Sequence, residues 1–387
     1  MTEAAISLTD QTGAEAGETL GSAVLEQLGG EQPHALIVFA SPGQDHRALL
    51  KALRGTCGRA ALVGCTSAGE FTNQAAGTGM TCVVALHAPE MGFTAIMGRG
   101  LREDRARAAS QLAAGFRGDS HPEFQHRSAL ILTDALAGFA DDLVERLTIQ
   151  TGGVYRFFGG GAGDDARFEK TFVFCDEEVA TDAVVGLEIL SHGPVGVGVQ
   201  HGWSPGHERM RVTEAAGMTV TSLNAAPAAE AFEAHALATG QKLDRQAPIP
   251  FFLHNVLGVE SVDGYRLRVP LAVEPDGSVN CAADVPQGAG VCIMATTPAA
   301  AADAAATATR SALEQLEGRD PAVALVFDCV ATRLRLGEGF AQELNAVQRE
   351  LGDLPFAGCN TYGQIAHAAG QFSGFHNCTA VVCVIPR

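Results

Sequence analysis

The sequence predicts an α/β protein built from repeated βαβ-type units with mixed sheets. Three observations predict this class. Three separate segments begin with an apolar strand, an amphipathic helix follows each strand, and a short strand running into a glycine-rich turn follows each helix. Recurrence of this order predicts related strand–helix–strand units with right-handed connections. A layered α-β-β-α sandwich is the alternative arrangement of the same elements.

The elements of each unit are expected in the same order. The opening strands are expected at 34–40, 128–134 and 322–328, and the helices near 44–54, 138–149 and 338–351. In the third helix, Phe340, Leu344 and Val347 recur at helical spacing, and Gly352 is typical of a helix end. A further apolar strand closes each unit, at 81–88, 183–190 and 379–386.

The region between the second and third units is rich in strand patterns. Strands are expected within 193–206, 264–285 and 290–296, with a hairpin turn at 275–277. A helix is expected over 227–238. Thr297 and Pro298 indicate the start of a second helix, as N-cap and first helical residue, which Gly318 should end. We expect a domain boundary near 215–228.

Glycine turns follow the second strand of each unit, at 62–70, 156–165 and 355–364. Glycine at such turns either supplies tight backbone packing or lets backbone N–H groups approach a ligand. The polar neighbours, which include Asp165, favour the second interpretation and suit a small polar or zwitterionic ligand. The candidate ligand-binding residues are Cys65, Thr66, Ser67, Glu70, Gly160, Asp164, Cys359, Asn360, Tyr362 and Gln364. From the first glycine of each segment onward these turns contain no basic residue, so they do not predict a phosphate clamp.

Composition argues against several classes of protein. The chain has 387 residues, and its 26 Lys and Arg against 44 Asp and Glu give a formal charge of −18. Nucleic-acid binding is disfavoured because it needs clustered positive charge. The first residues do not resemble a secretory signal, and polar residues interrupt the longest apolar stretch, Val184 to Val199. We therefore expect a cytoplasmic protein without a membrane span, whose ten cysteines are reduced.

Two further chemistries are weighed. Cys65 or Cys359 could act as a nucleophile with His367 or His376 as base, but a small buried residue at a tight turn is the favoured interpretation. A thiol-dependent enzyme is thus the least favoured hypothesis. His201 and His376 are candidate metal ligands only if haem is bound.

The chain resembles the FIST family of bacterial sensory proteins along nearly its whole length. The resemblance rests on LVGCTSAGEF (62–71), FFGGGAGDD (157–165), HGWSPG (201–206), VTEAAGMTVTSLNAAPA (212–228), NTYGQIAH (360–367) and FSGFHN (372–377). It implies an amino-terminal FIST domain at 34–225 and a carboxyl-terminal one at 226–387, which ends in a return strand.

The resemblance implies a stand-alone, non-enzymatic sensor for an amino acid or related metabolite. Such a sensor signals by contact, so we expect a protein partner such as a histidine kinase, and a homodimer is left open. Some family members are haem proteins that sense nitric oxide and regulate a histidine kinase. A haem-based nitric oxide sensor is therefore the alternative function, with the cofactor left unknown.

Overall fold

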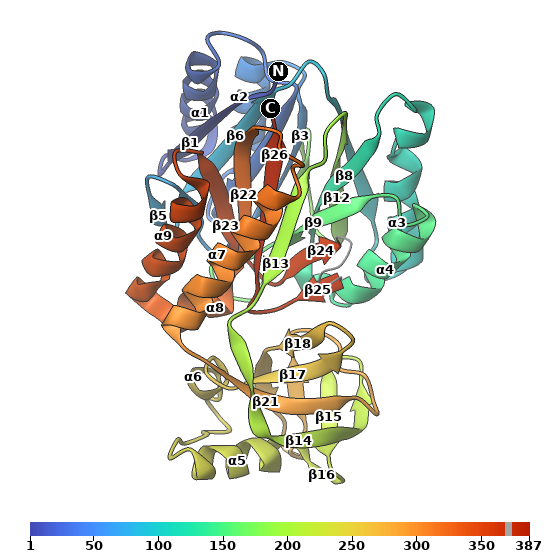
Figure 1. The fold of residues 1–387 in the computed structure, drawn as a ribbon, viewed down its shortest axis with the longest axis vertical. Helices are drawn as coiled ribbons and strands as arrows, with labels where there is room; N and C mark the ends of the chain where they lie inside the picture. Colours follow the sequence, from blue (N-terminus) through green and yellow to red (C-terminus); the bar gives the residue numbers. More distant parts are fainter. Residues whose placement is uncertain (368–373) are drawn as a thin grey trace.

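A computed structural model describes residues 1–367 and 374–387 (Figure 1). Phe372 and Ser373, part of one of the motifs above, lie outside the described residues. The described chain forms a body of three mixed six-stranded sheets and a smaller insert with a sheet of its own. This confirms the predicted mixed α/β class.

The body consists of three units with one topology. The first unit contains β1 (Glu3–Thr9), α1 (Gly13–Gln27), β2 (Ala35–Ala40), α2 (His46–Cys57), β3 (Ala61–Thr66) and β6 (Thr81–His87). The second contains β7 (Gly92–Arg99), α3 (Arg105–Gly115), β8 (His126–Thr133), α4 (Ala140–Gln150), β9 (Arg156–Gly161) and β12 (Ala183–Ser191). The third contains β13 (Gly196–Gln200), α7 (Pro298–Glu314), β22 (Pro321–Cys329), α8 (Val330–Leu336), α9 (Phe340–Leu351), β23 (Phe356–Thr361) and β26 (Ala380–Pro386).

The three units share one pattern of parallel and antiparallel strand pairs. The predicted βαβ pairs, β2 with β3, β8 with β9 and β22 with β23, are parallel. The closing strand of each unit lies antiparallel between the first and second strands. The sequence-predicted repeats are therefore confirmed, and each repeat is longer than predicted because a strand and a helix precede it.

A hairpin from each unit pairs with the sheet of a neighbouring unit. The hairpins are β4 (Glu70–Thr72) with β5 (Ala76–Gly77), β10 (Val173–Cys175) with β11 (Glu178–Ala180), and β24 (Gln364–His367) with β25 (Gly374–His376). The first extends the sheet of the third unit, the second that of the first unit, and the third that of the second unit. This exchange closes the three units into a ring.

The inner faces of the three sheets share one core. Side chains alternate along a strand, so Ile37 and Phe39 point inward while Leu36 and Val38 point outward. Phe327 packs against Phe39 from the first unit, at 5.7 Å between ring centres. It also packs against Phe158 from the second unit, at 6.4 Å. A core enclosed by three sheets replaces the layered sandwich considered as the alternative.

Helices cover the outer face of each sheet. Their apolar stripes form separate clusters with the outward residues of the strands, for example Leu20 and Leu50 over Val38. In the third unit the contact is close, because a Cβ on Gly198 of β13 would lie 1.8 Å from the carbonyl oxygen of Ala308 in α7. Glycine is therefore required where α7 crosses this strand.

The insert occupies the chain between β13 and α7 and lies at one end of the body (Figure 1). Its strands are β14 (Trp203–Ala216), β15 (Thr219–Leu223), β16 (Ala226–Pro227), β17 (Val256–Ser261), β18 (Gly264–Arg268), β19 (Pro270–Val273), β20 (Val279–Cys281) and β21 (Gly290–Thr296). Its helices are α5 (Ala228–Ala238) and α6 (Ile249–Phe252). Short 3-10 turns elsewhere are η1 (Gly118–Ser120), η2 (Ala135–Ala137) and η3 (Gly337–Gly339).

The predicted local features of this region are confirmed. Helix α5 matches the helix expected over 227–238, and β19 and β20 pair around the expected hairpin turn. Thr297 caps α7 by accepting a hydrogen bond from the N–H of Ala300 at 3.1 Å. Helix α7 ends at Glu314, before the expected stop at Gly318. The boundary at 225/226 stays a prediction; it falls within the insert, and β13 before it pairs with β26 after it.

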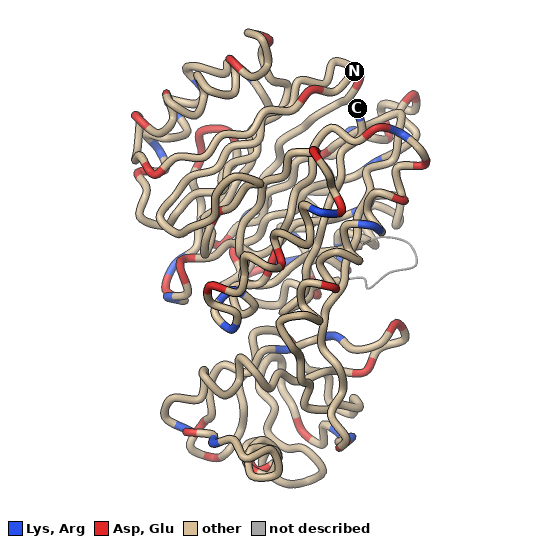
Figure 2. Tube along the Cα trace, turned by 60° about the vertical axis from the view of Figure 1, so that its left-hand side comes forward, with Lys and Arg blue, Asp and Glu red and all other residues tan. Residues whose placement is uncertain are grey.

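Charged residues are spread over the body and the insert. Figure 2 shows the positions of acidic and basic residues interspersed along both parts of the chain. Within the described ranges, no helix is long and apolar enough to cross a bilayer.

Candidate functional site

The three glycine turns meet at one place, which we call the turn junction (66–70, 161–165 and 360–364). The N–H of Ala68 donates to the carbonyl of Asn360 at 2.8 Å, joining the first and third turns. The N–H of Gly163 donates to Thr66, and that of Tyr362 to Gly161, both at 2.9 Å. Every turn is thus bonded to the other two, so the residues predicted from separate segments come together.

Close backbone contact explains glycine at the turn junction. A Cβ on Gly163 would lie 2.8 Å from the backbone nitrogen of Ala68. Gly69 has a φ of +127°, which L side chains rarely adopt. The packing and ligand-binding interpretations of the glycines therefore do not exclude each other.

A buried carboxylate lies at the centre of the junction. Glu70 is fully buried, accepts a hydrogen bond from the Ser67 hydroxyl, and accepts another from the N–H of Met80 at 3.2 Å. Burial, with a smaller contribution from nearby Asp165, raises the pKa of Glu70 to about 7 against the opposing effects of its hydrogen bonds and of Arg333. Glu70 can therefore change its charge near neutral pH.

Three buried polar atoms beside Glu70 have no hydrogen-bond partner among the residues that the structure describes. They are Nδ2 of Asn360, Oδ1 of Asp165 and Nε of Arg333. A Cβ on Gly69 would lie 3.0 Å from Oδ1 of Asn360 and 3.4 Å from Nε of Arg333, which places these side chains together. Asp165 interacts electrostatically with both Glu70 and Arg333. We call Glu70, Asp165, Arg333 and Asn360 the polar cluster.

Unsatisfied buried atoms of this kind are rare in folded proteins, because each costs about 1–3 kcal/mol. Arg333 and Asn360 offer N–H donors, and Asp165 and Glu70 offer carboxylate oxygens. Donors and acceptors of opposite charge at one place can bind a ligand that carries both an acidic and a basic group.

The two predicted thiols point into the core of the body, where Cys359 lies opposite Glu70 in the pairing of β23 with β4. Cys65 and Cys359 are both fully buried in the core shared by the three sheets. Burial raises the pKa of Cys359 well above its usual range, and the neighbouring Cys65 adds to the rise. Thr66 is also buried. Its hydroxyl accepts a hydrogen bond from the N–H of Phe172 at 3.0 Å, which links the segment before β10 to the first turn.

Asp164 and Tyr362 hold the second and third turns together. The Asp164 carboxylate accepts a hydrogen bond from the Tyr362 hydroxyl. It also accepts hydrogen bonds at 2.7–2.8 Å from the backbone N–H groups of Phe168, Glu169 and Lys170. The Tyr362 ring stacks on Phe168 at 4.4 Å between centres. These contacts order the loop that begins with Asp165.

Gln364 and Gly160 are placed within the sheet of the second unit. Gln364 is fully buried and its amide donates to the Thr361 hydroxyl at 2.9 Å. A Cβ on Gly160 would lie 2.8 Å from the carbonyl oxygen of Gly363. Gln364 therefore supports the turn junction through a side-chain hydrogen bond, and Gly160 supports it through close backbone packing.

Arg333 was not among the residues predicted from the sequence, because it lies outside the three glycine turns. It lies on α8, directly after β22. Because β22 and β23 are parallel neighbours, residues that follow β22 lie beside the turn that follows β23. This topological rule could have pointed to the segment after 322–328 as a part of the site.

The two histidines considered for haem lie apart from the polar cluster in the fold. His201 precedes the insert, with Nε2 3.0 Å from the carbonyl of Tyr265 and Nδ1 accepting from the N–H of Trp203 at 3.2 Å. His376 is buried on β25, opposite Gln364. Both ring nitrogens of His201 are occupied by the protein, which does not fit an iron ligand, and we derive no chemistry through haem. Among the described residues, no group of three or more His, Cys, Asp or Glu could hold a metal ion.

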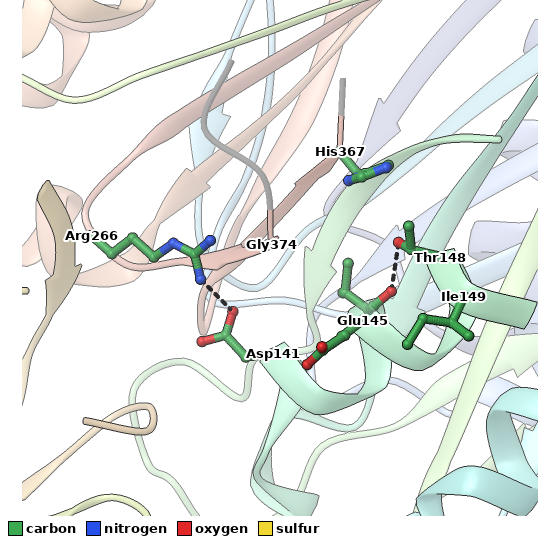
Figure 3. A pocket seen from close by; sticks show the side chains of 8 residues that line it. Asp141, Glu145, Thr148, Ile149, Arg266, His367 and Gly374 are labelled. Atoms are coloured by element: carbon green, nitrogen blue, oxygen red, sulfur yellow. Dashed lines mark hydrogen bonds and ion pairs between the residues drawn. The ribbon is translucent and has the colours of Figure 1, made fainter. Parts of the chain in front are cut away.

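Three cavities lie between the body and the insert. One, of about 400 Å³, is lined by Tyr362 and Phe168 beside the turn junction and by insert residues that include Met218 and Ala282. A second, of about 370 Å³, lies between α4 and β18, where Arg266 faces Asp141 at 3.9 Å (Figure 3). A third, of about 640 Å³, is lined by α4 and by insert residues that include Val259. We call the first the turn-side cavity, since it adjoins the predicted residues.

Comparison with known proteins agrees with the motifs. Residues 34–226 match the FIST N domain, and residues 228–367 match the FIST C domain. Two uncharacterized proteins of Mycobacterium tuberculosis, MT0656 of strain CDC 1551 and Rv0628c of strain H37Rv, are each 26% identical over 369 residues, covering 92% of both chains.

Solved structures give weaker likenesses. A cyanuric acid hydrolase from A. caulinodans is 9% identical with a TM-score of 0.35, covering 100% of this chain and 99% of its own. PurLQS from Thermotoga maritima is 12% identical with a TM-score of 0.21, covering 99% and 72%. We infer nothing from scores this low. The two domain matches together cover most of the sequence, and the chain therefore belongs to the FIST family.

Proposed function

We propose that the polar cluster binds a small zwitterionic ligand, an amino acid or a related metabolite, and that the protein is a non-enzymatic sensor. FIST domains are associated with small-ligand sensing in signalling. The observation that carries the proposal is the set of three buried polar atoms, on Asp165, Arg333 and Asn360, that lack partners in the described protein.

The chemistry of the cluster suits both ends of an α-amino acid. A ligand carboxylate would accept hydrogen bonds from Arg333 and Asn360, and a ligand ammonium would donate to Asp165 and Glu70. Hydrogen bonds that involve charged groups contribute about 1.5–3 kcal/mol each, more than neutral ones. Binding would thus satisfy the orphaned atoms and pair the charges of the polar cluster together.

The position of the cluster suits a sensor. Glu70 comes from the first unit, Asp165 from the second, and Arg333 and Asn360 from the third. A ligand that contacts all four side chains would stabilise one arrangement of the three units, as ligands select among conformations. In the proposal, a protein partner such as a histidine kinase recognises this arrangement of the units.

Thiol chemistry has little support. Cys65 and Cys359 are fully buried among apolar side chains, whereas a nucleophilic cysteine needs access and a lowered pKa. The proposal therefore assigns them to packing.

The test is a binding measurement on site variants. A panel of the common L-amino acids is screened against the wild-type protein by thermal shift, and hits are titrated by calorimetry. Asn360→Ala, Glu70→Ala and Arg333→Gln should each weaken binding about tenfold or more. Arg349→Gln, an exposed change on α9, is the matched control and should bind normally. Normal binding by all three folded site variants would contradict the proposal.

A further inference from the structure

The turn-side cavity is walled by two parts of the molecule. Leu136 and Phe168 come from the second unit and Tyr362 from the third, while Met218, Leu271 and Ala282 come from the insert. The wall is mainly apolar. Its polar side chains are already engaged, because Thr219 donates to Asn280 at 2.7 Å and the Tyr362 hydroxyl donates to Asp164.

A small buried apolar cluster adjoins both this cavity and the polar cluster. Ala68, Val330 and Tyr362 form a small buried cluster, against which Ala135, Leu136 and Ala166 pack. Ala68 lies next to Gly69, and Ala166 follows Asp165 directly. The buried cluster therefore extends from the sequence neighbours of the polar cluster to the cavity wall, and the Tyr362 ring belongs to both the cluster and the wall.

We infer that the ligand is an amino acid with a large apolar side chain, which occupies the turn-side cavity while the charged groups bind the polar cluster. The inference rests on the proposed function and adds the class of side chain. A cavity of about 400 Å³ lies within the range of small-molecule pockets and is larger than a glycine or alanine ligand would need. Its engaged polar groups offer nothing to a charged or amide side chain.

The insert has a defined role in this account. Met218, Leu271 and Ala282 would touch the ligand side chain, while the polar cluster lies wholly in the body. The bound ligand would then join the insert to the body, and the insert would set the selectivity.

The experiment compares glycine, L-leucine, L-phenylalanine and L-aspartate as probes by calorimetry. The wild-type protein should bind leucine and phenylalanine about tenfold or more tightly than glycine or aspartate, because burying a large apolar side chain contributes that much. Ala282→Phe fills the cavity and should remove this preference. Met218→Ala enlarges the cavity and should shift the preference from leucine towards phenylalanine.

Outcomes separate the inference from the proposed function. If glycine or aspartate binds as tightly as leucine and Arg333→Gln abolishes that binding, the side-chain inference is overturned and the polar cluster stands. Failure of every amino acid to bind overturns both. If Ala282→Phe does not fold, Met218→Ala decides, and an unchanged ratio of leucine to phenylalanine affinity overturns the inference.

Discussion

Ala68 and Asn360 join the first and third units through their backbones at the turn junction. The N–H of Ala68 donates to the carbonyl of Asn360, and the N–H of Asn360 donates to the carbonyl of Gly69, both at 2.8 Å. With its backbone fixed on both sides, Asn360 holds its amide at the polar cluster, where Nδ2 has no partner in the described chain. The contacts that close the ring of units therefore also position a candidate ligand-binding group.

Glu70 should make stability depend on pH. Its folded pKa of about 7 exceeds the usual 4.5, so the folded state holds this proton more tightly than the unfolded state. The stabilisation is complete below about pH 4.5 and is lost as pH rises to about 7, at up to about 1.4 kcal/mol per pH unit.

Glu70→Gln should remove this dependence. Urea unfolding at a series of pH values should show the free energy of unfolding of the wild-type protein falling relative to that of Glu70→Gln between these limits, and a constant difference above them. Parallel curves across the whole range would show that Glu70 does not titrate as its burial implies.

The contact between β13 and α7 should reject any side chain at Gly198. Gly198→Ala would place a Cβ 1.8 Å from the Ala308 carbonyl oxygen, and overpacking of this kind costs about 3 kcal/mol. Gly55→Ala is the matched control: Gly55 lies in α2 with nothing within 4 Å of the new Cβ. It should stabilise the protein by about 0.5–1 kcal/mol. Equal effects of the two changes in chemical denaturation would refute this packing.

The shared core should unfold as one cooperative unit. Phe327 is fully buried between rings from the other two units, so Phe327→Ala should lower the free energy of unfolding by about 3–5 kcal/mol. Ile149→Ala, at a side chain 69% exposed, should change it by less than about 0.5 kcal/mol. Calorimetry should give a single transition for the body; separate transitions for the units would contradict a common core.

Thiol reactivity should follow exposure. Cys175 is partly exposed and the other nine cysteines are buried. Burial raises the pKa of Cys175 to about 12, so even this thiol should react slowly with iodoacetamide at neutral pH. Mass spectrometry of the native protein should find Cys175 modified first, and all ten modified after unfolding. Rapid modification of Cys65 or Cys359 would revive the enzyme hypothesis.

Local signals in the sequence were enough to predict the units. Apolar runs, helical spacing and glycine stops identified β22, α9 and β23, and Thr297 identified the start of α7, because these features depend on nearby residues. Strand alternation does not say which face is inner when both faces of a sheet are covered. The inward position of Cys65 and Cys359 was therefore missed.

Features that depend on the closure of the ring were not predictable. The hairpin exchange follows from contacts between distant segments, such as Gly358 paired with Phe71. The full length of the third unit is not visible in the sequence, because the insert separates β13 from α7 along the chain. Arg333 reaches the site through the parallel pairing of β22 and β23, although the turns themselves contain no basic residue.

Titration of the wild-type and Arg333→Gln proteins with the L-amino acid that most raises thermal stability tests the central claim most directly. The account predicts saturable binding to the wild-type protein, one ligand per chain, and a loss of affinity of about tenfold or more in the variant at unchanged stability. Equal affinity in the two proteins would contradict the assignment of the polar cluster as the ligand site.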